Sequence, residues 1–175
     1  MALTVCMLLT GAAVLAAEAP AQTEAAPFTV RGMTFGMTLE QVIAAETAGR
    51  YELDNERTLG PVTFTKLEYE DVRENGVPCD VNYLFVNDLL VAAKINYDTD
   101  DIGFDQLKAD LTRLYGESAG LDTAALGNGI YAVDDDGRSE SKVEAWTSGD
   151  VMIVLEKDDD DLDVTYVDLA ASYIK

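Results

Sequence analysis

Two apolar runs separated by a two-residue turn constrain the fold of this chain more than any other feature. The runs span residues 79–86 and 89–97, and Asn87 and Asp88 lie between them. Apolar side chains that recur at every second position are typical of a strand with one buried face, and Asn and Asp favour tight turns. The pattern therefore predicts a β-hairpin. The residues expected on its buried faces are Val81, Tyr83, Phe85, Leu89, Val91, Ala93, Ile95 and Tyr97.

Further strands are expected on both sides of this hairpin. In the segment 62–72, Leu67 and Tyr69 alternate with charged residues, and the turn-forming sequence NGVP follows at 75–78. This strand should complete an antiparallel meander with the hairpin. The remaining strands are expected at 28–31, 130–133, 142–147, 151–156 and 163–169.

Two helices are expected. Thr38 has the character of an N-cap with Gln41 as its capping-box partner, and the first helix should end at Gly49. The second helix has Gly116 as its stop signal. Their apolar stripes consist of Leu39, Val42 and Ile43, and of Phe104, Leu107, Leu111 and Leu114.

The glycines Gly32 and Gly36 just before the first helix raise the question of a phosphate-binding loop. A Walker loop needs Lys and Ser or Thr directly after its last glycine, but Met37 follows Gly36. The spacing does not fit the dinucleotide fingerprint either. We therefore expect a structural loop in which the glycines form the turn and Thr38 caps the helix.

These elements predict an α+β fold made of two helix-plus-antiparallel-meander units, at 28–99 and 100–175, around one continuous or paired sheet. Thr38 and Gly103 open the two helices, and Asp88 and Asp150 close turns that look equivalent. This spacing suggests an internal duplication. The alternative is that any α+β chain of this length shows two such segments.

The N-terminal residues indicate export. Residues 2–17 are uncharged and apolar, and Ala19-Pro20-Ala21 fits a signal-peptidase site, which predicts a signal peptide at 1–21 and a disordered leader at 22–27. Cleavage after Ala16 or Ala17, or an uncleaved membrane anchor, are the alternatives. Cleavage leaves Cys79 as the one cysteine, which we expect to be buried in a strand.

Composition excludes several classes of function. The formal net charge of −21 disfavours nucleic acids and anionic membrane surfaces as partners. The chain has no histidine, so Ser-His-Asp and Cys-His catalysis and imidazole-based zinc sites are excluded. The acidic residues cluster on expected turns and exposed strand faces and not across a cleft, and no nucleophile motif is present, so we expect no enzyme.

A candidate protein-binding set consists of Trp146, Glu144 and Tyr166. Trp146 is the only tryptophan and alternates with Glu144, while Val143 and Ala145 occupy the other face of the strand. If Val143 points inward, Trp146 faces solvent or a partner, as binding anchors do. Partial burial of Trp146 under the second helix or a loop is the alternative.

Two acidic turns form a candidate metal site. Alternate turns of a meander lie at the same end of a sheet, so residues 134–136 and 158–161 should lie about 10 Å apart. Calcium is the cation that such oxygen ligands favour, although neither turn continues into an EF-hand. Solvated turns that aid solubility are the alternative. The candidate ligands are Asp134, Asp135, Asp136, Asp158, Asp159, Asp160 and Asp161.

The pattern Gly36-x-Thr38-x-x-x-Val42, the aromatic hairpins and a second helix ending in Tyr115-Gly116 resemble a group of uncharacterised bacterial exported proteins. These are similar to the tandem modules of beta-lactamase-inhibitor-like proteins and of small outer-membrane-assembly lipoproteins. The resemblance covers residues 28–169 and implies a curved sheet that presents one face to a protein partner, without catalytic residues. The lipoprotein box is missing, and the disulfides of some such inhibitors cannot form here.

The sequence therefore predicts an exported, non-catalytic module in the periplasm or outside the cell that binds an unidentified protein partner and needs no cofactor. The competing hypothesis is a calcium-binding or salt-adapted module that uses its acidic turns.

Overall fold

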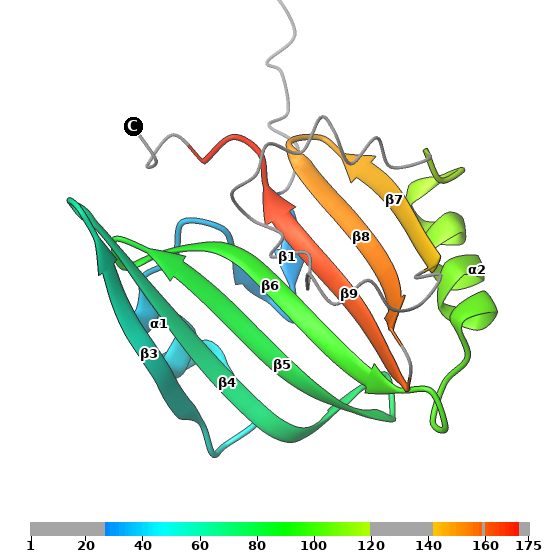
Figure 1. Ribbon diagram of the computed structural model, residues 1–175, viewed down its shortest axis with the longest axis horizontal. Coiled ribbons are helices and arrows are strands. Elements are labelled where there is room, and N and C mark those ends of the chain that lie inside the picture. Colours follow the sequence, from blue (N-terminus) through cyan, green and yellow to red (C-terminus); the bar gives the residue numbers. More distant parts are fainter. Residues whose placement is uncertain (1–26, 120–141, 159, 172–175) are drawn as a thin grey trace, which may run out of the picture.

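The computed structural model describes residues 27–119, 142–158 and 160–171, without the side chains of 54–57. It has an α+β architecture, which confirms the predicted class (Figure 1). The elements in chain order are β1 (Thr29–Val30), β2 (Met33–Thr34), α1 (Leu39–Ala45), β3 (Glu52–Leu59), β4 (Val62–Glu74), β5 (Val77–Val86), β6 (Leu89–Asp98), α2 (Phe104–Tyr115), β7 (Lys142–Ser148), β8 (Val151–Asp158) and β9 (Asp161–Asp168). In the described residues, neither helix is long and apolar enough to cross a membrane.

A twisted sheet of seven strands forms the body of the molecule, in the order β3-β4-β5-β6-β9-β8-β7 (Figure 1). All its neighbouring strands are antiparallel. Strands β3–β6 and strands β7–β9 join through β6 and β9, with Ala92 opposite Val167 and Asp98 opposite Asp161. The sheet is therefore continuous from one edge to the other.

Both helices pack on the same side of this sheet, which we call the helix face. Val42 of α1 and Leu107 and Leu111 of α2 are buried there. They pack against inward-facing strand residues, among which Tyr83, Phe85, Tyr97 and Cys79 are buried as predicted. Leu114 departs from the predicted stripe: it is exposed, and Tyr115 packs against the core in its place.

The opposite side, which we call the second face, carries a separate apolar cluster. Its buried members are Val86, Val91, Ala92, Ala145, Met152, Val154 and Val167. Val91 was expected on the same face as Ala93, and that expectation is wrong. Leu84 pairs with Ala92 while Phe85 pairs with Leu90, so Val91 is an extra residue in β6. Such a β-bulge reverses the alternation of the strand, and Leu90 instead faces the helices.

The loop before α1 is a structural turn, as predicted. Gly36 has a φ of 85°, and its N–H donates to the Leu90 carbonyl over 2.9 Å. The Thr38 hydroxyl accepts from the Gln41 N–H, and the Gln41 side chain accepts from the Thr38 N–H, which completes the capping box. The helix ends at Ala45, four residues before Gly49. These contacts fix α1 against the start of β6.

Candidate functional site

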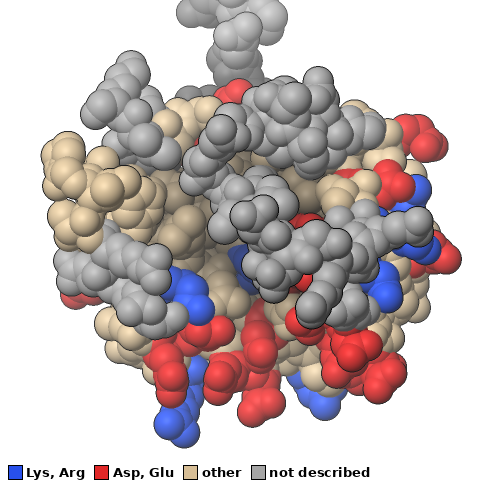
Figure 2. All heavy atoms as spheres, in the orientation of Figure 1, with Lys and Arg blue, Asp and Glu red and all other residues tan. Residues whose placement is uncertain are grey.

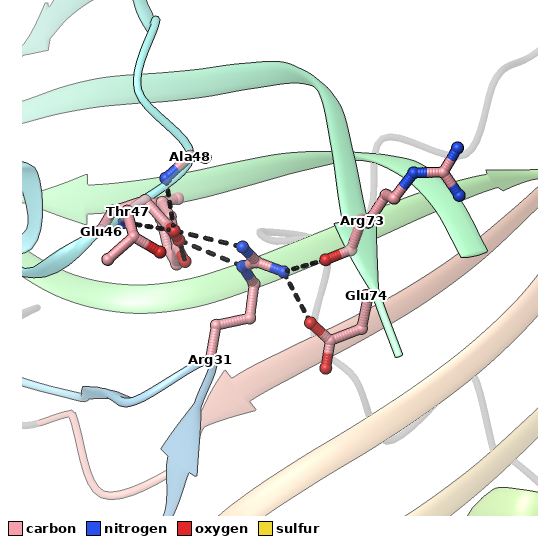
Figure 3. A network of polar contacts seen from close by, with 7 residues as sticks. Arg31, Glu46, Thr47, Ala48, Arg73 and Glu74 are labelled. Carbon is pink, nitrogen blue, oxygen red and sulfur yellow. Dashed lines mark hydrogen bonds and ion pairs between the residues drawn. The ribbon is translucent and has the colours of Figure 1, made fainter. Parts of the chain in front are cut away.

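A partly buried polar network on the helix face is the most elaborate side-chain arrangement among the described residues (Figure 3). Arg31, in the turn between β1 and β2, inserts its guanidinium between two carboxylates (Figure 3). Its Nε and Nη2 lie 3.1 Å from the two oxygens of Glu46, at the end of α1. Its Nη1 lies 2.6 Å from Glu74 Oε2 and donates to the Arg73 carbonyl over 3.2 Å, both in β4. One side chain thus ties the N-terminal hairpin to a helix and a strand.

The Glu46 carboxylate accepts three further hydrogen bonds. The Tyr83 hydroxyl of β5 donates over 2.6 Å, and the N–H groups of Thr47 and Ala48 donate over 2.8 and 3.1 Å. The side chain of Glu46 is 2% exposed. A buried charge is tolerated when a partner and enough donors satisfy it, and Glu46 has both.

The network shifts the ionisation of its members. Burial acts to raise the pKa of Glu46, but the hydrogen bonds from Arg31 and Tyr83 outweigh it and lower the pKa below its usual value. The hydrogen bond to Glu46 raises the pKa of Arg31 further above its normal range. Burial, together with the neighbouring Glu46, raises the pKa of Tyr83. At neutral pH the site therefore holds a carboxylate, a guanidinium and a protonated phenol.

Sequence reasoning missed this network because its members are far apart in the chain: Arg31 is 15 residues from Glu46 and 43 from Glu74. The one local signal is a single cation between Val30 and Met33, two residues that are both buried. A lone arginine in an apolar hairpin needs a carboxylate partner, but the sequence does not say which one.

Trp146 lies in the core. Its side chain is 1% exposed, and its indole N–H donates to the Gly116 carbonyl over 3.0 Å, just after α2. The prediction of an exposed aromatic anchor is wrong. The alternative, partial burial under the second helix or a loop, is correct about burial, which is almost complete. The reason is the direction of β7: Trp146 is opposite Ile153 on the helix face, whereas Ala145 and Val143 belong to the second-face cluster.

Glu144 and Tyr166 lie on the same face as Trp146. Glu144 forms an ion pair with Lys108 of α2 and accepts a hydrogen bond from the Ser118 hydroxyl, and both contacts lower its pKa. Tyr166 is half-buried, its ring centroid is 6.0 Å from that of Phe28, and burial raises its pKa. The structure thus brings the predicted binding set together on the helix face and engages each member in internal contacts.

The structure describes only part of the two predicted acidic turns. Asp158 and Asp161 are opposite each other where β8 turns into β9, and Asp161 is also opposite Asp98 of β6. The Asp160 carbonyl accepts from the Thr99 N–H over 2.9 Å. Residues 134–136 and Asp159 lie outside the described residues. Within the described residues, no group of three or more carboxylates, cysteines or histidines is arranged to hold a metal ion.

The acidic character continues onto the second face. Asp163 of β9 accepts from Lys94 over 2.5 Å and from the Asn96 amide over 2.9 Å. Glu156 is directly opposite Asp163, and burial together with this like charge raises its pKa. In the space-filling view, acidic side chains gather along the lower rim with basic ones scattered among them (Figure 2).

Strand β3, which the sequence patterns did not reveal, forms an edge of the sheet and exposes apolar side chains. Leu53 and Leu59 are 55% and 75% exposed, and Tyr51, just before the strand, is 41% exposed. Within the described sheet β3 pairs only with β4, and a β-bulge between Asp54 and Arg57 divides that pairing into two stretches. The bulge puts Leu53 and Leu59 on opposite faces, and the residues between them are polar, so no period-two alternation marks this strand in the sequence.

The opposite edge differs from β3. On the outer side of β7, the Ala119 N–H already donates to the Ala145 carbonyl over 2.8 Å. Among the described residues, no comparable backbone bond reaches the outer side of β3. Unpaired N–H and C=O groups beside exposed apolar side chains are the features that let a sheet edge accept another strand.

Comparisons with known proteins give no match. No protein family fits the sequence, and no similar protein is found among the curated proteins or the solved structures. The functional interpretation therefore rests on the geometry of this chain.

Proposed function

We propose that the chain is an exported, non-catalytic module that binds a protein partner in the periplasm or outside the cell, and that the partner adds an extended segment to the open edge of β3. The observation that carries the proposal is the exposure of Leu53 and Leu59 on a strand that lacks a second strand neighbour in the described sheet. The aromatic side chains on β5 and β7 are buried in the core, so they are not available to a partner. We therefore assign binding to the edge of β3 and not to these side chains.

The geometry of β3 constrains the positions of apolar residues in the partner segment. Leu53 is opposite Leu67, which faces the helices, whereas Leu59 is opposite Val62, which belongs to the second-face cluster. An added strand would therefore meet one exposed leucine on each side of the sheet. Because the bulge interrupts β3, we expect the segment to pair along two short stretches, with apolar residues at the positions that meet the leucines.

Site-specific photo-crosslinking in an exporting cell tests this proposal. A benzophenone amino acid replaces Leu59, and in a matched control it replaces Leu114 of α2, which is also exposed, at 66%. We expect a discrete protein adduct from position 59 and none from position 114. The adduct should weaken when Leu53→Lys is added. Equal adducts from the two positions, or none from position 59, would refute binding at this edge.

We also propose that the two helix-plus-meander units arose by internal duplication. In support, α1 precedes the meander β3–β6, α2 precedes β7–β9, and the two sets meet through their last strands. Fragments 28–99 and 100–175 are produced separately, and the folding of each is measured to test whether each unit forms structure alone. If both fragments are unfolded, the result argues against two units.

A second candidate function uses the acidic end of the sheet. The observation that favours it is the row Asp98, Asp161 and Asp158, which are paired across three neighbouring strands. The repulsion between these carboxylates decreases when a cation binds to them or when salt screens their charges. Calcium and sodium chloride at equal ionic strength distinguish the two cases, because a specific site responds to calcium alone.

A further inference from the structure

The two carboxylates around Arg31 form a recognition site for a guanidinium group. Both carboxylate oxygens of Glu46 accept hydrogen bonds from the guanidinium, through Nε and Nη2. The remaining nitrogen, Nη1, donates to Glu74 and to the Arg73 carbonyl. This fork-on-carboxylate geometry matches arginine and not lysine. The side chain of Arg31 is only 11% exposed in this position, so the site encloses it almost completely.

The site is built by elements other than the hairpin that fills it. Tyr83 and the N–H groups of Thr47 and Ala48 hold the Glu46 carboxylate, and none of them belongs to β1 or β2. Glu74 extends from β4. The Glu46 carboxylate therefore keeps these three donors when the guanidinium leaves, as a preorganised receptor site requires.

The hairpin that supplies Arg31 is short and pairs only with itself, although Val30 and Met33 are buried in the core. Its strands have two residues each and form a separate sheet. Arg31 has a φ of 52°, in the left-handed region that non-glycine residues adopt only at a cost. Beyond Arg31, the ring of Phe28 anchors the hairpin by packing 6.0–6.3 Å from Phe35, Tyr115 and Tyr166.

We propose that this pocket is an arginine-binding site that is occupied by Arg31 of the same chain, and that a segment of a partner protein, with an arginine between apolar residues, displaces the hairpin and takes the pocket. The chemistry of the pocket and the segment of this chain that now fills it define the partner segment. That segment has the guanidinium of Arg31 between two apolar residues, Val30 and Met33, and an aromatic residue, Phe28, before them. This site lies on the helix face and is separate from the edge of β3.

Chemical rescue tests the pocket itself. The full chain with Arg31→Ala is heated with ethylguanidinium chloride or with ethylammonium chloride at about 10 mM, beside the unsubstituted chain. We expect ethylguanidinium to raise the melting temperature of Arg31→Ala by about 3 °C or more, because it fills the vacated site. Ethylammonium should not do so, and the unsubstituted chain should respond to neither cation. Equal responses to the two cations, or no response, would overturn the proposal.

Displacement is tested on the unsubstituted chain, which also covers the case that Arg31→Ala fails to fold. The probe is a synthetic peptide with the sequence of residues 28–35, FTVRGMTF, and the control replaces its arginine with the neutral isostere citrulline. We expect the arginine peptide to accelerate amide hydrogen exchange in residues 29–34 of the chain by about tenfold, and the citrulline peptide to leave it unchanged. The same effect from both peptides, or none from either, would refute displacement by arginine.

Discussion

Replacing Arg31 with methionine should destabilise the protein far more than the loss of an ordinary surface cation. The substitution keeps most of the apolar side chain but removes the guanidinium from Glu46, whose side chain is 2% exposed. Removing one partner of a buried ion pair typically costs about 3–5 kcal/mol. Because Glu46 keeps its hydrogen bonds from Tyr83, Thr47 and Ala48, we expect the lower end of this range.

Urea unfolding followed by fluorescence measures this cost, because Trp146 is the only tryptophan and is buried. The matched control is Arg113→Met, which removes an exposed arginine that is paired with Asp110 on α2. Exposed pairs contribute little, so the control should change the free energy of unfolding by less than about 1 kcal/mol. If Arg31→Met costs no more than Arg113→Met, the reasoning that the buried pair fastens the hairpin is refuted.

The pH dependence gives a second readout of the same pair. The folded-state pKa of Glu46 lies below its unfolded value, so its contribution to stability is present above the unfolded pKa and is lost as the pH falls through the folded pKa. Arg31→Met removes the main contact that opposes burial, so the pKa of Glu46 is higher in the variant. The stability difference between the two proteins should therefore shrink as the pH falls from the variant's pKa towards that of the unsubstituted protein. A difference that grows on acidification would contradict the assigned sign.

Four further outcomes are expected. Leu53→Lys and Leu59→Lys should each change the free energy of unfolding by less than about 0.5 kcal/mol because these residues are exposed, whereas Leu67→Ala, at a fully buried position, should cost about 2–5 kcal/mol in urea unfolding. Thr38→Ala removes the capping box of α1 and should cost about 1 kcal/mol; an unchanged stability would mean that the cap is not formed in solution. Burial raises the pKa of the Cys79 thiol, so a maleimide should label it slowly in the native protein and rapidly in urea; rapid native labelling would contradict its burial. Calcium and sodium chloride at equal ionic strength should raise the melting temperature equally, and a rise with calcium alone would instead favour the calcium-binding alternative.

Local patterns predicted the elements whose determinants are local. The alternation around Leu67 and Tyr69, the capping pair Thr38 and Gln41, and the turn at Asn87 each act within a few residues, and all are present in the structure. Bulges are not visible in this way, because one extra residue in a strand costs little locally and is fixed by pairing with a neighbour. The reversal of Val91 is an example.

The candidate sites were harder to predict because they depend on which face a strand turns to the helices. For Trp146, the sequence left both faces open, and the packing of α2 over β7 decided between them. For Arg31, the sequence offered every carboxylate of a strongly acidic chain as a partner, and the tertiary fold selected Glu46 and Glu74. In both cases long-range packing supplied the missing information.

The junction between β6 and β9 has a consequence for how the chain assembles. Asn96 and its partner Asp163 are 67 residues apart, and β9 is the last strand of the described chain. The chain is synthesised from its N-terminus, so β3 to β6 emerge first. Until β9 is synthesised, β6 is an unpaired edge strand of ten residues that is rich in apolar side chains. Pairings of such high sequence separation form slowly, and waiting edges recruit other strands. Until this junction closes, a nascent chain therefore exposes an edge at which other strands can add.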